Sequence, residues 1–333
     1  MYQLVPENRV QFGKVLSESL TIFWQHRSLW IASLIAGLFG QGRINTSLNF
    51  SQQQPFPQTA PGQVPDFGQM FRGTIFEDVL RNPMPYLLIG GTLWLIWGLL
   101  SLIVGSWASG ALIYMVDEID HNGATSLGSG WRATRKRLGQ LIGLRIVVIL
   151  PFLLIMALIV VSVFPIWLQV MRSLLLPPDQ VEQALKTINP SQFSGLFCLV
   201  PLALCIVLPV TLGLAAISVF AERACLLEAL GIMPSLRRGW QILRAQIGYA
   251  ILGWVMSFVV GMVTSILLFA PIFSFWGSTI GEFFAQGLSP EVISKMTIVG
   301  LYLMIASLTL GSWVAGWNSV FWTKLYKAFT GLG

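Results

Sequence analysis

The stretch Ile146-Val-Val-Ile-Leu-Pro-Phe-Leu-Leu-Ile-Met-Ala-Leu-Ile-Val-Val161 is apolar at all of its positions. A strand of a transmembrane barrel alternates apolar and polar side chains, so this stretch favours a membrane-spanning helix with apolar surroundings on every side. The whole chain has the same character, with 55% hydrophobic and 10% charged residues among 333 and a mean hydropathy of +0.72. The sequence therefore predicts an all-α, polytopic membrane protein.

Six apolar stretches approach or exceed the length of about 20 helical residues that crosses a hydrocarbon core of about 30 Å. The first is the weakest, because its purely apolar run from Ser28 to Gly40 is short. We interpret it as a retained span rather than a signal peptide, since a long amphipathic segment precedes it and no small-x-small cleavage site follows. The predicted spans are residues 22–41, 86–116, 140–168, 195–221, 247–276 and 296–322.

Fourteen of the 20 lysine and arginine residues lie in the segments on one side of these spans. Positively charged loops stay in the cytoplasm, so that side and both termini are predicted to be cytoplasmic. The positive charge lies next to lipid, which makes anionic headgroups a better match for it than nucleic acid. On the other side, the Gln- and Pro-rich segment 41–83 is too poor in aliphatic residues to fold alone and is predicted to be a mobile external loop.

Two of the cytoplasmic segments share the pattern S-L-x-x-G-W-x-x-x-R-x-x-x-G, which begins at Ser126 and again at Ser235. A degenerate third copy places Leu16 and Leu20 at the Leu and Trp positions. The simplest architecture is a single membrane domain made of three tandem two-helix units, each with a cytoplasmic interfacial helix, an outgoing span, an external loop and a returning span. Within residues 1–333, the units cover about 10–120, 121–230 and 231–333.

Each copy of the pattern predicts an amphipathic helix that lies half-sunk at headgroup depth. In the later copy, Leu236, Trp240 and Leu243 share one helical face, and a Trp ring suits this depth because its N–H stays wet. Topological anchoring and specific headgroup binding both explain such segments, and anchoring is their more common role. The candidate lipid-interface residues are Trp131, Arg135, Arg237, Arg238, Trp240 and Arg244.

The second and sixth predicted spans contain related glycine motifs, Gly105-Ser-Trp-Ala-Ser-Gly110 and Gly311-Ser-Trp-Val-Ala-Gly316. Small residues let neighbouring helices approach closely, so Gly105, Gly110, Gly311 and Gly316 are candidate helix-packing residues.

No catalytic constellation is apparent in the sequence. The two histidines, His26 and His121, have no carboxylate or cysteine at ligand spacing, and HExxH, GxSxG and P-loop motifs are absent. The sequence predicts a protein that is not an enzyme and has no cofactor, no metal site and no catalytic residues.

The charged residues near the span ends have structural interpretations. The cluster Asp117-Glu118-Ile-Asp120-His121 is predicted to be a solvated helix end that pairs with Arg132 or Arg135. The pair Glu222-Arg223 is predicted to be a second such end. The side chain of Arg145 is predicted to reach the cytoplasmic interface along its own stem.

The segment from Ala221 to Arg244 resembles a broad bacterial family of six-helix membrane proteins, which are similar to the membrane domain attached to some glycerophosphoryl diester phosphodiesterases. The resemblance implies a membrane module without the enzyme, in a bacterial cytoplasmic membrane. We expect a non-enzymatic module that organises lipids or a protein partner. The alternative is a transporter or channel for small molecules or lipids, in which proline-broken spans surround a central cavity.

Overall fold

The computed structural model describes residues 11–39, 83–174, 190–286 and 290–332. These residues form helices and no strand, which confirms the all-α prediction for this part of the chain. The predicted loop 41–83 lies outside the described residues except for Pro83, where α5 begins. The helices are α1 (Phe12–Gln25), α2 (Arg27–Leu38), α5 (Pro83–Asn122), α6 (Leu127–Arg135), α7 (Leu138–Leu174), α9 (Pro190–Leu227), α10 (Ile232–Ala245), α11 (Ile247–Gln286) and α12 (Pro290–Thr330).

Five helical segments are long and apolar enough to cross a membrane, so the chain is a multi-pass membrane protein. The predicted first span, residues 22–41, is not one long helix. Its residues 22–25 belong to α1, and the helix that follows, α2, has only 12 residues, a length of about 18 Å. The five segments are Met84–Asn122, Leu138–Ser162, Leu208–Leu227, Ile247–Ala270 and Ser294–Thr330.

The chain divides into two compact units. Unit 2 comprises Leu48–Gly98 and Val147–Leu214. Its described side chains include many exposed apolar ones, such as Trp94 and Val161. So much exposed apolar surface suits an apolar solvent. Unit 1, which comprises Met1–Ser47, Leu99–Ile146 and Ala215–Gly333, contains the buried core.

The core of unit 1 is built around the C-terminal part of α12. Large side chains of this segment are fully buried, and they point to several sides of the helix: Trp317, Phe321, Trp322, Leu325, Tyr326 and Phe329. A helix that is apolar all round is buried by neighbours on all of its faces. The end of α12 therefore positions the other helices of unit 1.

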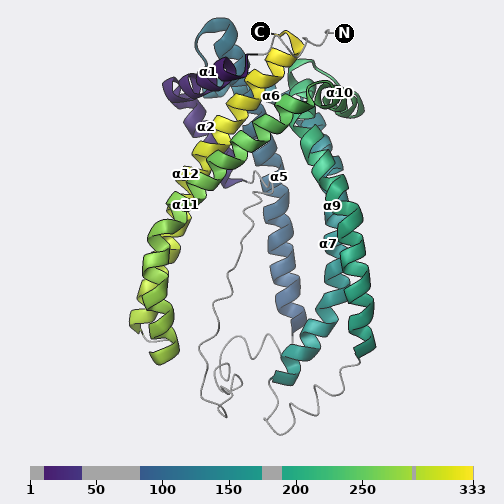
Figure 1. Ribbon diagram of the computed structural model, residues 1–333, viewed down its shortest axis with the longest axis vertical. Coiled ribbons are helices and arrows are strands. Elements are labelled where there is room, and N and C mark those ends of the chain that lie inside the picture. Colours follow the sequence, from purple (N-terminus) through teal and green to yellow (C-terminus); the bar gives the residue numbers. More distant parts are fainter. Residues whose placement is uncertain (1–10, 40–82, 175–189, 287–289, 333) are drawn as a thin grey trace. The chain divides into compact units, whose positions relative to one another are not determined.

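Helices α1, α2 and α11 pack on α12 (Figure 1). On the α2 side, a Cβ atom on Gly316 would lie 2.5 Å from Ser33 Cβ, and one on Gly37 would lie 3.1 Å from Ser312 Cα. As α2 advances by four residues, its contact on α12 moves back by four, so the two helices are antiparallel. On the α11 side, the ring of Trp322 occupies the space beside Gly253.

The chain bends sharply at His26, between α1 and α2. His26 has an extended backbone conformation, and Trp30 Nε1 donates a hydrogen bond of 2.8 Å to the Phe23 carbonyl across the bend. Trp24 and Trp30 meet edge to face with ring centroids 5.5 Å apart. These contacts fix the angle at which α2 leaves α1.

A close contact between helix backbones explains why the repeated pattern contains a glycine. A Cβ atom on Gly130 of α6 would lie 3.0 Å from the Ala111 carbonyl oxygen of α5, and one on Gly239 of α10 would lie 2.8 Å from the Ile217 carbonyl oxygen of α9. Each short helix thus packs its backbone directly against the long helix that precedes it. Only glycine permits this approach without a shift of the backbone.

Replacing Gly130 by alanine should therefore destabilise unit 1 by about 1–3 kcal/mol, the usual range for overpacking. Gly128 of the same helix is a matched control, because a Cβ atom there meets only the end of the Arg132 side chain at 3.9 Å. The measurement is the thermal unfolding midpoint of both variants in detergent. Equal midpoints for Gly130→Ala and Gly128→Ala would contradict the close approach.

Candidate functional site: the polar end of unit 1

The short helices α1, α6 and α10 lie with the adjoining ends of α5, α9 and α12 at one end of unit 1, which we call the polar end (Figure 1). Most ionisable side chains of unit 1 gather there. They fall into two groups: side chains that are paired within the protein, several of them buried, and exposed side chains without such a partner.

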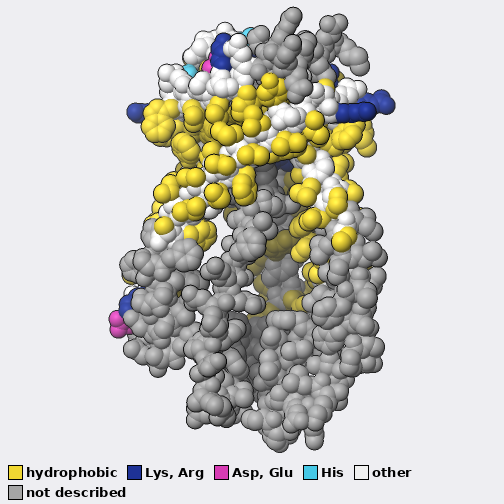
Figure 2. All heavy atoms as spheres, viewed as in Figure 1, with side chains coloured by type: hydrophobic (Ala, Val, Ile, Leu, Met, Phe, Trp, Pro, Cys, Tyr) yellow, Lys and Arg dark blue, Asp and Glu magenta, His cyan; other side chains and the backbone are white. Residues whose placement is uncertain are grey.

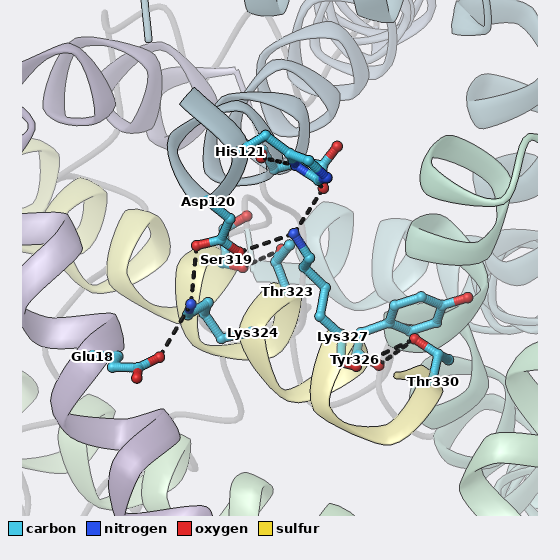
Figure 3. Close-up of polar contacts among 10 residues, drawn as sticks. Glu18, Asp120, His121, Ser319, Thr323, Lys324, Tyr326, Lys327 and Thr330 are labelled. Carbon is cyan, nitrogen blue, oxygen red and sulfur yellow. Dashed lines mark hydrogen bonds and ion pairs between the residues drawn. The ribbon is translucent and has the colours of Figure 1, made fainter. Parts of the chain in front are cut away.

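The first paired group, in which Lys327 is the buried member, joins α12 to α5 and α1 (Figure 3). Lys327 Nζ lies 2.9 Å from Asp117 Oδ1 and 3.0 Å from Asp120 Oδ2. Lys324 Nζ lies 2.9 Å from Asp120 Oδ1 and 3.1 Å from Glu18 Oε2. The Lys327 side chain is only 4% exposed, and an ammonium group so deeply buried needs its carboxylates. These contacts form a continuous network across the three helices.

The prediction that the acidic cluster pairs with Arg132 or Arg135 is wrong. Asp117 and Asp120 pair with the lysines of α12. The guanidinium Nε of Arg132 donates instead to the Gly128 carbonyl of its own helix, at 3.2 Å.

A second buried group centres on Glu228, just after the end of α9. Arg238 Nε of α10 lies 3.2 Å from Glu228 Oε1, and the Tyr326 hydroxyl of α12 donates to the same oxygen. Arg238, a predicted lipid-interface residue, is only 8% exposed. It therefore faces the interior of unit 1, where it holds α10 against α9 and α12.

A third buried group lies nearer the middle of the helices. Arg145 Nε of α7 lies 3.1 Å from Glu222 Oε1 of α9, and its Nη2 donates to Ser109 Oγ of α5. Arg223 is fully buried and donates to the Ser319 carbonyl of α12 at 3.1 Å. The predictions for these residues are wrong: Arg145 does not extend to the interface, and Glu222-Arg223 is not a solvated helix end.

The remaining lipid-interface candidates are at the surface to different degrees. Arg135, Arg237 and Arg244 are exposed, and Trp240 is 51% exposed. Trp131 is half-buried, because its ring meets Trp107 edge to face with centroids 4.4 Å apart. The two pattern tryptophans, although equivalent in sequence, therefore have different surroundings.

The prediction that Leu243 shares the lipid-facing side of Trp240 is wrong, because Leu243 is buried in the core of unit 1.

In Figure 2, hydrophobic side chains form the surface beneath the polar end, and lysine and arginine side chains project from its edges.

The predicted packing glycines also differ from one another. Gly110 and Gly316 are in close contact, since a Cβ atom on Gly110 would lie 2.4 Å from Thr134 Cγ2 and one on Gly316 would touch Ser33. Gly105 is buried in α5. Gly311 is exposed and has no atom within 4 Å of an added Cβ, so no helix packs on it among the described residues.

The lysines of α12 are the main residues of the polar end that the sequence reasoning missed. A signal was present, because Lys324 and Lys327 are three positions apart, as are Asp117 and Asp120. This spacing places each pair on one side of its helix. Within the described residues, no group of three or more His, Cys, Asp or Glu side chains is placed to hold a metal ion.

A family model described as a family of unknown function (DUF7544) matches residues 21–324. No curated protein and no solved structure matches the chain.

Replacing Arg145 by methionine should lower the free energy of unfolding by about 3–5 kcal/mol, because the Glu222 carboxylate stays buried without the arginine. The double variant Arg145→Met/Glu222→Gln should recover most of this loss, since it removes both charges of the Arg145–Glu222 pair. Arg135→Met is the control and should change stability by less than about 0.5 kcal/mol. Unfolding in detergent measures all three, and a double variant as unstable as Arg145→Met would contradict the pairing.

Proposed function

We propose that this chain, which belongs to the family of unknown function DUF7544, is a non-enzymatic membrane module that organises anionic lipids on the cytoplasmic side of a bacterial cytoplasmic membrane. The observation that carries the proposal is the division of charge at the polar end. Buried charges bind the helices to one another, whereas Arg135, Arg237 and Arg244 are exposed. These three exposed arginines have no ion-pair partner among the described residues. Exposed cations beside apolar surface suit anionic headgroups.

A six-span arrangement is part of the proposal, with α2 as the start of the first span. The antiparallel contact of α2 with α12 supports this. Helix α12 runs towards the polar end, so α2 runs away from it. The outer side of α2 is apolar, with Trp30, Ile31 and Leu34 exposed. Such a surface is suited to lipid.

Three tandem two-helix units are also part of the proposal. Gly130 of α6 packs on α5, and Gly239 of α10 packs on α9, through the same kind of backbone contact. In α1 the corresponding residue is Ser19, which is small and fully buried. Helix α1 packs on α12, with Phe12 and Phe321 edge to face at 5.8 Å. Each short helix would thus cover a returning span, and α1 would cover the last one.

The proposed relationship to the membrane domains of glycerophosphoryl diester phosphodiesterases rests on residues 221–244. The alternative of a transporter gains no support at the polar end, where α5, α9 and α12 contact one another directly. Tyr114 of α5 donates to the Leu226 carbonyl of α9 at 3.0 Å, and Phe220 of α9 meets Trp322 of α12 at 5.6 Å. This direct packing favours a static module.

The orientation predicts which side of the membrane each end occupies. In a variant without native cysteines, Gln241→Cys on the exposed side of α10 should react with a membrane-impermeant maleimide only in inside-out vesicles. Glu291→Cys at the start of α12 should react only in right-side-out vesicles, because the positive polar end stays in the cytoplasm. The reverse labelling pattern would overturn the orientation.

The lipid-organising role predicts that the reconstituted protein enriches anionic phosphatidylglycerol over phosphatidylcholine around itself. Replacing Arg132, Arg135, Arg237 and Arg244 together by glutamine should abolish this preference, since each cation near an anionic surface contributes about 1 kcal/mol. Lys295→Gln, far along α12 from the polar end, is the control and should retain it. Spin-labelled lipids measure the preference, and equal selectivity of the quadruple variant and the wild type would contradict the role.

A further inference from the structure

Adjacent arginines of α10 have opposite environments. Arg238 is buried against Glu228, whereas Arg237 is exposed. Arg244, two turns further along, is exposed as well. Neither Arg237 nor Arg244 has a hydrogen-bond or ion-pair partner within the described part of the chain. The helix is thus held in place by one arginine and presents two others outward.

The exposed side of α10 has two parallel ridges. Met233 and Trp240 are seven positions apart, close to two full turns, and are 68% and 51% exposed. Arg237 and Arg244 are also seven positions apart and form a second ridge beside the first. Their Cα atoms are about 10.5 Å apart along the helix axis, and Trp240 lies between them in the sequence. An apolar ridge next to a cationic ridge is complementary to a lipid, which has acyl chains next to a phosphate.

We infer that this exposed side of α10 is a binding site for a single anionic phospholipid. Arg237 and Arg244 hold the phosphate from both sides, because guanidinium groups donate paired hydrogen bonds to phosphate oxygens. The acyl chains lie along Met233 and Trp240. This inference rests on the proposed lipid-organising function and assigns it to one helix.

The equivalent surfaces of the other short helices lack one of the two ridges. In α6, Arg132 folds back onto the Gly128 carbonyl, and Trp131 is turned against Trp107. Its cations therefore have no exposed aromatic neighbour of their own. In α1, the positions that correspond to Arg237 and Arg244 are Ser17 and Trp24, which are uncharged. Among the three short helices that carry the repeated pattern, α10 is the one that has both ridges at these positions.

The test titrates phosphatidylglycerol against the full-length protein in detergent and resolves individual binding events by native mass spectrometry. The wild type should bind one phosphatidylglycerol more tightly than phosphatidylcholine. Arg237→Gln/Arg244→Gln should weaken that event about 30-fold, which corresponds to about 2 kcal/mol. Arg132→Gln/Arg135→Gln, which removes the same charge, should change it less than threefold. Inorganic phosphate at millimolar concentration should not displace the lipid, because it has no acyl chains.

Each remaining outcome has a definite meaning. If the two double variants lose affinity equally, the α10 site is wrong, while the lipid-organising role stands. If phosphate displaces the lipid, the site is an anion site and the assigned acyl contacts are wrong. If the wild type does not prefer phosphatidylglycerol at all, both the site and the proposed function fail.

Discussion

A buried ammonium group requires carboxylates around it, and Lys327 imposes this requirement on unit 1. Its side chain is 4% exposed and contacts Asp117 and Asp120 of α5. Lys324, one turn away, extends the network to Glu18 of α1. The removal of both aspartates would leave the ammonium group of Lys327 unpaired in a buried site. The ends of α1, α5 and α12 are therefore fixed relative to one another by charge as well as by the aromatic core around Trp317 and Trp322.

Because several charges are paired inside unit 1, only part of the positive charge of the polar end is available to lipid headgroups. Positive residues were expected to face lipid headgroups as a group, yet Arg145, Arg223 and Arg238 are buried in contacts within unit 1. The exposed cations without an ion-pair partner among the described residues are Arg27, Arg132, Arg135, Lys136, Arg237 and Arg244, and they lie on the short helices or directly beside them. These cations are carried by separate short segments, which is why the proposed role concerns particular lipids on particular helices rather than a general positive field.

The sequence predicted the features that follow from composition and periodicity, and missed those that depend on distant partners. Hydropathy located the five long spans, and the repeated pattern located α6 and α10, because these signals are local. Hydropathy did not predict the bend at His26, which divides the predicted first span between α1 and α2. The burial of Arg238 beside the exposed Arg237 was not predictable, because it requires the position of Glu228, ten residues away in another element. The same holds for Arg145 and Glu222.

The division between buried and exposed arginines is the central claim, and modification by an arginine-specific dicarbonyl reagent tests it directly in folded protein that has been stripped of lipid in detergent. Mass spectrometry then reports the modification rate at each site. Arg237 and Arg244 should react readily, whereas Arg145, Arg223 and Arg238 should be protected until the protein unfolds. Equal rates at the neighbours Arg237 and Arg238 would contradict the account, because α10 would then not be held by one arginine while it presents the other.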